Sequence, residues 1–316
     1  MIRNLEAGSE APSVSVVIPC YSVPADHFRQ AIDSVIAQSI GDWEAIVVDD
    51  GGSEFDLAAM VRSVEDVRIR VVKHSRNRGL GAARNTGFKN ARASLVAMLD
   101  ADDRLLPDYL RRMTEAIRYA PDTNWVWTDI ETVGDKPGEW RFPDPPVPLC
   151  PAHMNYRGGS SLIPSMVWEA VGGFVEDPLL AGLEDLDFWL GALEVGAHPI
   201  YVHELLYQWR VSSESMTFQF SPNSHLQMDE IFKRRRQVFE GASPCADCSG
   251  GEPGSIFRSR GYFNSSVHAR RSGHRFSSLN LGLRAWFLNR ADPAVRRHLV
   301  RMMIPGRMSR LLNRDA

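Results

Sequence analysis

The chain has 316 residues, of which 44% are hydrophobic and 24% are charged, values that are ordinary for a soluble globular protein. Four cysteines in this length do not make a disulfide scaffold, and no uncharged run approaches the roughly 18–20 residues that a membrane span needs. The net charge of −3 hides an asymmetry, because residues 255–316 hold 13 Arg, no Lys and only two acidic residues.

Strand and helix patterns alternate along the first 119 residues. Residues 1–12 have acidic residues and no apolar core, so we expect no signal peptide and a cytoplasmic location. Apolar and β-branched runs predict strands at 14–18, 43–48, 69–72 and 95–99. Helical spacing predicts helices at 26–38, 57–64, 81–91 and 107–119. The alternation predicts βαβ units and a largely parallel sheet, hence an α/β fold.

The pattern changes after residue 124. We expect strands at 125–130, 158–163 and 199–209, helices at 165–171 and 184–195, and a Pro-rich loop at 134–154. A polar helix at 222–240 precedes a Gly/Ser/Pro/Cys-rich linker at 241–254, and the tail has helical stretches near 279–290 and 294–304. The predicted division is an α/β domain at 13–220, a helix and linker at 221–254, and a basic helical extension at 255–316.

Three carboxylates, those of Asp100, Asp102 and Asp103, follow the predicted strand at 95–99. In open α/β sheets, ligands bind at the carboxyl ends of the strands. Carboxylates this close repel one another unless a cation or hydrogen bonds offset the repulsion, and divalent metals that hold diphosphates take one or two of them. The segment therefore indicates a metal–nucleotide site. The alternative is that Asp102 or Asp103 only caps the helix that Pro107 begins.

Six motifs, taken together, resemble glycosyltransferase family 2, the inverting nucleotide-sugar transferases of GT-A fold. The resemblance covers roughly residues 13–220 and rests on residues 17–21, 47–53, 77–87, 99–103, 172–174 and 184–185. It implies a GT-A fold, that is, a Rossmann-like, mostly parallel sheet flanked by helices. It also implies metal-dependent transfer of a sugar from a nucleoside-diphosphate sugar to a hydroxyl of a glycan or lipid-linked acceptor, in cell-surface glycan or glycolipid synthesis. The Gln-x-x-Arg-Trp pattern of polymerising relatives is absent, which favours transfer of one sugar.

The resemblance assigns the nucleotide to the first motifs. Pro19 fixes the turn beneath Tyr21, whose ring would stack on the nucleobase. Asp50 would face the nucleoside, while Asp49 would brace the turn. Arg84 would bring positive charge near phosphate. The alternatives are a half-buried rim position for Tyr21 and a solvated helix-surface position for Arg84.

The resemblance assigns metal and catalysis to the later motifs. Asp102 would bind Mg²⁺ or Mn²⁺, and Asp100 the metal or the ribose. Glu184 would contact the donor, and Asp185 would be the general base that takes the acceptor proton. The alternative for this last pair is that both acids only stabilise a helix start. UDP-sugars are the commonest donors of such a family.

One position departs from the family pattern. Ser212 stands where many members have a histidine that completes the metal shell. Either the metal lacks this ligand or another group replaces it, and His203 is a remote candidate for that role. Cys245 and Cys248 could form half of a zinc site with His268 and His274, but the spacing from Cys248 is too long for a standard finger. We therefore favour free thiols in a linker, with Cys20 buried and Cys150 isolated.

The Arg-rich tail leaves two interpretations open. Apolar residues between 296 and 312, flanked by Arg, could lie on an anionic membrane surface, giving a peripheral location on the inner membrane face. Alternatively, the apolar face packs on the α/β domain. Nucleic-acid binding is a third option for an Arg-rich tail, but nothing else in the chain supports it. The rival to an enzyme is a non-catalytic nucleotide-sugar-binding protein or an adaptor for anionic surfaces.

Overall fold

The protein folds into two compact units. The computed structural model describes residues 11–118, 124–142, 150–151, 160–212, 222–242, 248 and 251–303. The first unit comprises Met1–Val147 and Tyr156–Ser215, and the second comprises Pro148–Asn155 and Met216–Ala316. The second unit therefore takes in the helix and linker that the sequence separated from the basic extension, together with a short segment from the middle of the chain.

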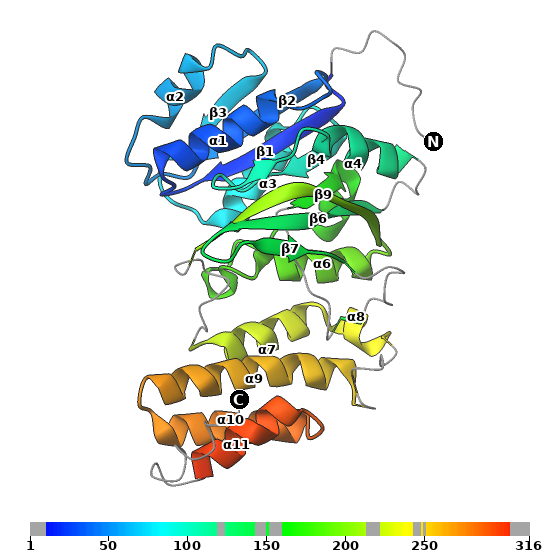
Figure 1. Ribbon diagram of the computed structural model, residues 1–316. Helices are drawn as coiled ribbons and strands as arrows, with labels where there is room; N and C mark the ends of the chain where they lie inside the picture. The colour runs from blue at the N-terminus through cyan, green and yellow to red at the C-terminus, as the bar shows by residue number, and fades with distance from the viewer. Residues whose placement is uncertain are drawn as a thin grey trace. The chain divides into compact units, whose positions relative to one another are not determined.

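A nine-stranded sheet forms the centre of the first unit (Figure 1). The described strands follow the order β3-β2-β1-β4-β8-β6-β9-β5, and β7 pairs with β6. Strands β3, β2, β1 and β4 are parallel, whereas β8 runs antiparallel to both β4 and β6. The strand bounds are β1 Val14–Cys20, β2 Trp43–Asp49, β3 Ile69–Lys73, β4 Leu95–Met98, β5 Arg104–Leu105, β6 Trp125–Gly134, β7 Gly138–Trp140, β8 Ser161–Pro164 and β9 Pro199–Val211.

Helices cover both faces of this sheet. Every residue of β1 and β2 is buried, as expected for parallel strands between two helical layers. Val16 of β1 shares a core with Phe28, Leu57 and Tyr109, while Val17 faces Gly87 on the other side. The helices of this unit are α1 Ala25–Ile36, α2 Leu57–Ser63, α3 Leu80–Asn90, α4 Tyr109–Arg118, α5 Ser165–Val171 and α6 Glu184–Glu194, with a 3₁₀ turn at Pro178–Leu180.

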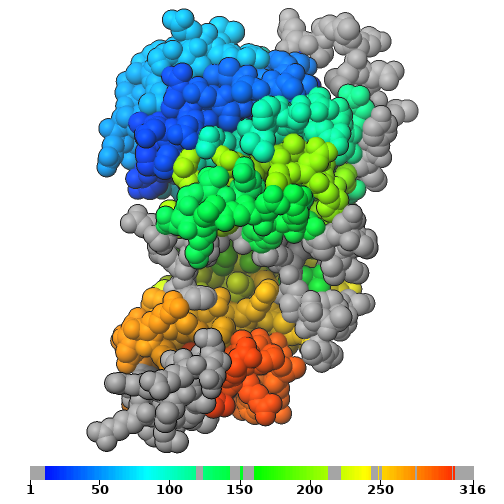
Figure 2. Space-filling model, in the orientation of Figure 1, coloured from blue at the N-terminus to red at the C-terminus, as the bar shows by residue number. Residues whose placement is uncertain are grey.

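The alternating elements predicted between residues 14 and 119 are confirmed, with shifts of one or two residues at most of their ends. The loop predicted at 134–154 is wrong in its first part. Gly134 ends β6 with φ at +89°, and β7 then pairs back on β6, so a hairpin lies at the surface there (Figure 2, green). Residues 143–149 and 152–159 lie outside the described part of the chain.

The second unit is helical. Its helices are α7 Ser224–Arg234, α8 Arg236–Glu240, α9 Pro253–Arg271, α10 Arg275–Leu288 and α11 Pro293–Met303. Helix α9 packs against both α7 and α10, and α10 also packs against α11. The sequence missed α9 altogether, although it predicted helices close to α10 and α11.

Two residues of the tail's apolar stripe, Leu299 and Met302, pack inside this helical unit, whereas Val300 is exposed and residues 304–312 lie outside the described part of the chain. Val295 and Leu299 of α11 are buried in a cluster with Tyr262 and Ala285, and Met302 packs against it. These positions are therefore covered by α9 and α10 of the same unit, an arrangement that is neither of the two interpretations the sequence left open for the tail. Several Arg side chains remain exposed: Arg260, Arg270, Arg271, Arg284, Arg290, Arg296 and Arg297. Within the described residues, no helix is long and apolar enough to cross a membrane, and peripheral membrane contact stays a prediction.

Candidate active site

The predicted nucleotide residues gather at the carboxyl edge of the parallel strands. Pro19 lies near the end of β1, beyond the last residue that pairs with β4, and Tyr21 follows the strand and is 56% exposed. The Tyr21 ring lies against the backbone of Gly52, where a Cβ atom would come within 2.5 Å of Cε2. Only glycine fits there, and its φ of +94° excludes most other residues as well. The strand end thus presents an aromatic face to solvent.

The two aspartates after β2 hold the loops around this edge. Asp49 Oδ1 accepts a hydrogen bond from the backbone N of Gly51 at 3.0 Å, which is the turn-bracing role expected of it. Asp50 is buried, and its Oδ1 accepts from Arg78 N at 2.9 Å while Oδ2 accepts from Gly79 N at 2.8 Å. His74 Nδ1 lies 2.6 Å from Asp50 Oδ1. Asp50 therefore fixes the loop that begins α3, and its contact with a nucleoside stays a prediction.

Arg84 is the centre of a buried ion-pair cluster. Its side chain is 3% exposed, and its two terminal nitrogens donate to Asp100 Oδ1 at 3.1 Å and to Glu184 Oε1 at 3.0 Å. The solvated position that the sequence left open for Arg84 is excluded. Burial lowers the pKa of Arg84, but the carboxylates of Asp100 and Glu184 raise it by more. Arg84 thereby joins Asp100, which is 16 positions away in the sequence, to Glu184, which is 100 positions away.

Glu184 and Asp185 begin α6 with different surroundings. Glu184 is buried, and its second oxygen accepts from Gly182 N at 2.8 Å. Asp185 Oδ1 accepts from Leu186 N at 2.7 Å, and no other hydrogen bond to its carboxylate is recorded among the described residues. Burial and the neighbouring Glu184 carboxylate raise the pKa of Asp185 to about 6, although Arg84 opposes this. An aspartate with this pKa can be ionised at neutral pH and still accept a proton.

The three carboxylates after β4 have separate environments. Asp103 is buried, and it accepts from Tyr207 Oη at 2.7 Å and from Arg210 N at 2.7 Å. It therefore ties β5 to β9 and caps no helix. Asp102 is half-buried, and burial together with the Asp100 carboxylate raises its pKa to about 6. Repulsion of this kind is relieved when a cation binds between two carboxylates.

The donor atoms at this edge fit a hard divalent cation. Asp102 and Asp100 offer only carboxylate oxygens, which Mg²⁺ and Mn²⁺ prefer. Among the described residues, no group of three or more His, Cys, Asp and Glu side chains is arranged to hold a metal. Two protein carboxylates, with diphosphate oxygens and water completing the shell, match the way Mg²⁺ is bound beside phosphates.

The position of the expected metal histidine lies at the end of β9. Ser212 directly follows the strand and is exposed. Arg210, two residues earlier, donates from Nε to the carbonyl oxygen of Asp102 at 3.1 Å. His203 lies earlier in β9, exposed, with its ring stacked on Tyr201 at 6.2 Å. The chain near Asp102 is therefore anchored by an arginine, whereas His203 belongs to another part of the strand.

The Gly-Gly-Phe motif is explained by a buried amide. Asn85 Oδ1 accepts from Phe174 N at 2.8 Å and from Trp168 Nε1 at 3.0 Å, while its Nδ2 donates to Phe174 O at 2.8 Å and to Glu176 at 2.9 Å. A Cβ at Gly173 would come within 2.8 Å of Asn85 Oδ1. Asn85 therefore fixes the segment that leads into Glu184 and Asp185.

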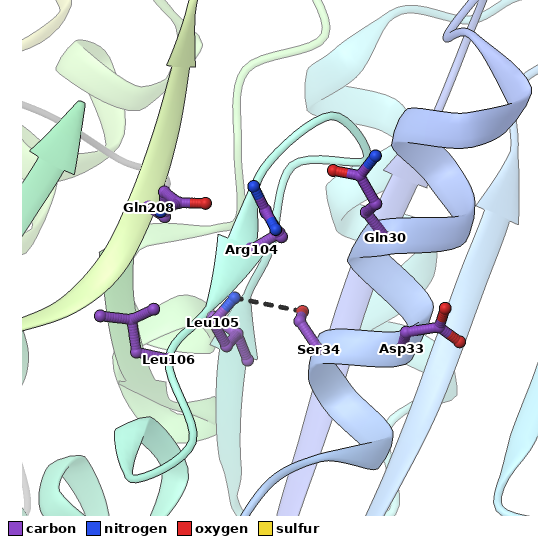
Figure 3. Close-up of a pocket in the computed structure, with 7 residues that line it drawn as sticks. All are labelled: Gln30, Asp33, Ser34, Arg104, Leu105, Leu106 and Gln208. Atoms are coloured by element: carbon purple, nitrogen blue, oxygen red, sulfur yellow. Dashed lines mark hydrogen bonds between the residues drawn. The ribbon is translucent and has the colours of Figure 1, made fainter. Parts of the chain in front are cut away.

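A separate cavity of about 280 Å³ lies beside α1. Figure 3 shows the side chains that line it, among which Leu105 N donates to Ser34 Oγ at 3.2 Å. Arg104 Nε and Gln208 Oε1 are buried there without a hydrogen-bond partner in the described structure. The lining residues are Gln30, Asp33, Ser34, Arg104, Leu105, Leu106 and Gln208. None of the predicted site residues lines this cavity.

Sequence reasoning missed several residues that shape the site. His74 bridges Asp50 to Thr86, whose Oγ1 lies 2.8 Å from His74 Nε2. Tyr207 joins the site because its hydroxyl bonds Asp103 and accepts from Asp100 N at 3.3 Å. A single histidine directly after a strand and a single tyrosine within one carry no local signal, so only the folded sheet brings them to this edge.

Comparison with known proteins identifies a family model and several relatives that this chain matches. The model of "Glycosyl transferase family 2" matches residues 15–169. An uncharacterized protein of Sinorhizobium fredii, y4gI, is 30% identical over 231 residues, covering 68% of this chain and 24% of that protein. The succinoglycan biosynthesis protein ExoO of Rhizobium meliloti is 41% identical over 112 residues, covering 35% and 32%. The chain thus spans a quarter to a third of the length of these relatives.

Solved structures agree on the fold. The crystal structure of S. aureus TarS 1-349 in complex with UDP-GlcNAc matches with a TM-score of 0.63 at 14% identity, covering 95% of this chain and 92% of that one. At this identity the match establishes a shared fold.

Proposed function

The chain belongs to glycosyl transferase family 2 through residues 15–169, and from this we propose that it transfers one sugar from a nucleoside-diphosphate sugar to a hydroxyl acceptor with inversion. The predicted GT-A-like α/β fold is confirmed. The proposal covers the donor, the metal and the acceptor. It rests above all on the cluster in which Arg84 joins Asp100, after β4, to Glu184, beside Asp185.

The donor end of the proposal is supported by the carboxyl edge of the sheet. The exposed Tyr21 ring would stack on the base, and Pro19 and Gly52 shape the turn around it. Asp102 and Asp100 would hold Mg²⁺ or Mn²⁺, which when bound neutralises the diphosphate leaving group. Arg84 holds the Asp100 carboxylate in place and adds positive charge close to the same group. A uridine diphosphate sugar is our expected donor, and TarS has been crystallised with UDP-GlcNAc.

The acceptor end of the proposal assigns proton removal to Asp185. The acceptor oxygen attacks the anomeric carbon from the face opposite the diphosphate, so one carbon–oxygen bond forms as the bond to the diphosphate breaks. The hydroxyl proton passes to the Asp185 carboxylate, whose raised pKa suits it to this task. We place the reaction in the synthesis of a glycan or a lipid-linked sugar, and the relative ExoO is named as a succinoglycan biosynthesis protein.

A donor screen tests the proposal. Purified protein would be incubated with Mn²⁺ or Mg²⁺ and a panel of nucleotide sugars, and released nucleoside diphosphate would be measured. We expect metal-dependent release from one donor. Asp102→Asn should reduce it at least 100-fold, whereas Glu169→Gln, which changes an exposed carboxylate of α5, should not.

Three results of this screen would contradict the proposal. Release that is independent of metal would remove the role given to Asp102 and Asp100. Full activity of Asp102→Asn would do the same. Donor binding without release, even with cell-extract acceptors present, would favour the rival nucleotide-sugar-binding protein.

A further inference from the structure

Helix α10 carries two large aromatic side chains on its solvent side. Phe276, near the start of the helix, is 93% exposed, and Phe287, near its end, is 63% exposed. The two positions are about three helical turns apart, so they lie on the same side of the helix, roughly 16 Å from each other. Two exposed rings on one helix face form a candidate contact surface.

The packing of the helical unit does not account for these two rings. Helix α10 packs on α9 and α11, and the most deeply buried positions of its inner side are the small residues Ser278, Gly282 and Ala285. Neither Phe276 nor Phe287 belongs to the apolar cluster of the unit. The largest apolar side chains of a surface helix normally face the core. Here two of them face outward instead.

The surroundings of this helix face are strongly basic. Residues 253–303, which form α9 to α11, hold ten Arg, no Lys and a single acidic residue, Asp292. Asp292 is engaged, because its Oδ1 accepts from a backbone N–H in the first turn of α11 at 2.7 Å. One of the ten, Arg258, is paired with Asp229 of α7. The three helices therefore carry a large excess of positive charge.

Two exposed arginines accompany the rings directly. Arg284 lies on the same side of α10 as Phe276 and Phe287, and Arg290 follows the end of the helix. The Arg290 guanidinium lies over the Phe287 ring, 5.6 Å from its centroid. The face thus combines apolar rings with cationic side chains whose long stems can keep the charge at a polar boundary.

We propose that this face of α10 docks the chain on the surface of an anionic lipid bilayer. Phe276 and Phe287 enter the boundary between headgroups and acyl chains, while Arg284 and Arg290 lie against the lipid phosphates. The arginines of α9 and α11 add to the attraction, because the surface potential of anionic lipids acts over about a Debye length. A partner that is negative at its surface and apolar beneath it matches both kinds of side chain.

Charge and shape disfavour the other occupants of this face. A second copy of the chain would bring the same positive charge to the contact, and like charges repel. Single-stranded nucleic acid can stack on aromatic rings, but it is bound in grooves that follow its backbone, whereas α10 presents an outward helix face. No residue of the candidate active site takes part, so the proposal does not depend on sugar transfer.

The contact differs from the one that the sequence pattern suggested. That pattern used apolar residues between 296 and 312, of which Leu299 and Met302 pack inside the helical unit. The exposed apolar side chains that the structure assigns to the bilayer belong to α10.

Vesicle flotation with the whole chain tests the proposal. Vesicles of phosphatidylcholine with about 30% phosphatidylglycerol would be compared with vesicles of phosphatidylcholine alone, at about 0.1 M and 0.5 M NaCl. We expect the chain to float with the anionic vesicles only. Binding should weaken at least fivefold at the higher salt concentration, because the ions screen the attraction between arginine and phosphate.

A double variant separates the rings from the charge. Phe276→Ser/Phe287→Ser should lower the partition coefficient on anionic vesicles at least tenfold, since the rings no longer bury apolar surface in the lipid. Both side chains are exposed, so the helical content measured by circular dichroism should be unchanged. Val67→Ser is the matched control, because Val67 is a fully exposed apolar residue of the first unit, and it should bind as the unaltered chain does.

A second double variant tests the charge. Arg284→Gln/Arg290→Gln should lower the partition coefficient about fivefold for each arginine removed. Arg62→Gln, which removes an arginine of α2 whose side chain is 70% exposed, should leave it unchanged.

Several results would overturn the proposal. These are no binding to anionic vesicles, equal binding to neutral ones, and unchanged binding of the double phenylalanine variant. A dimer in sedimentation equilibrium that dissociates in this variant would assign the face to a second copy. Tighter binding to a single-stranded oligonucleotide than to the vesicles, lost in the same variant, would assign it to nucleic acid.

Discussion

At the scale of single residues, the site is a set of carboxylates given different tasks by their neighbours. Asp50 and Asp103 are buried and bonded to backbone N–H groups of other segments, so they hold loops together. Asp102 and Asp185 are less enclosed, and the pKa of each is raised to about 6. Pairs of acids whose surroundings differ in this way are typical of sites that divide structural and chemical work.

Asp185→Asn should abolish transfer while leaving donor binding nearly intact. The amide cannot accept the acceptor proton, and a general base contributes roughly 10²–10⁴-fold to rate. We expect kcat to fall by about that factor, measured as released nucleoside diphosphate, with little change in donor affinity by calorimetry. Activity of the unaltered protein should also rise with pH through about 6, because Asp185 must be ionised to act.

Glu169→Gln is the control for this variant, since it neutralises an exposed carboxylate. Full activity in Asp185→Asn would remove this residue from the mechanism. A pH profile that is flat between pH 5 and 7 would do so as well.

Arg84→Met should destabilise the first unit and weaken donor binding. The change leaves the Asp100 and Glu184 carboxylates without their shared partner, and breaking a buried pair in this way costs about 3–5 kcal/mol. Denaturant unfolding would measure the loss. Arg62→Met is the matched control, because Arg62 is 70% exposed and its contact with Asp56 is 3.9 Å long, so a change below about 1 kcal/mol is expected there. Equal losses in the free energy of unfolding for the two variants would show that the Arg84 cluster stabilises the unit no more than an exposed arginine does.

The sequence predicted which residues gather at the edge but not how they are connected. Parallel strands bring their carboxyl ends to one edge, so Tyr21, Asp50 and Asp100 could be placed together from the strand pattern alone. The bond from Arg84 to Glu184 spans 100 residues and depends on how α6 meets α3. No local pattern encodes such a contact.

At the scale of elements, α9 shows where propensity misleads. The helix is rich in Gly and Ser, residues that favour turns over helix interiors, and the sequence therefore gave no helix there. In the structure these small residues are needed for close approach. A Cβ at Gly254 would come within 2.4 Å of Phe232 Cε2, and one at Gly261 within 2.6 Å of Ser224 O. Packing against α7 thus overrides the intrinsic preference.

Gly261→Ala should destabilise the helical unit, which is opposite to its usual effect in a helix. Alanine is favoured over glycine by about 1 kcal/mol in a helix interior, but here the new Cβ meets a backbone oxygen and the side chain of Met228. Overpacking of this kind costs about 1–3 kcal/mol. Thermal unfolding followed by circular dichroism would measure it. Asn264→Ala, in the same helix, should be neutral or stabilising, and a stabilising Gly261→Ala would contradict the packing of α9 on α7.

At the scale of the whole molecule, the chain joins a family domain to a helical unit of different character. The family model ends at residue 169, whereas the helical unit begins at Met216 and also takes in Pro148–Asn155. The carboxylates of the candidate site belong to the first unit, and the Arg-rich helices belong to the second.

The two units should consequently unfold in two calorimetric transitions that respond to different ligands. A donor with its metal at 100 times its Kd stabilises the unit that binds it by about 2.7 kcal/mol, which raises the midpoint of a unit of ~200 residues by roughly 5–10 °C. Only the transition of the first unit should shift to a higher temperature. Gly261→Ala should lower the other transition and leave the donor-sensitive one unchanged. A single transition that shifts with both the donor and Gly261→Ala would show that the chain unfolds as one cooperative body, because a separate helical unit could not sense a ligand held by Asp100 and Asp102.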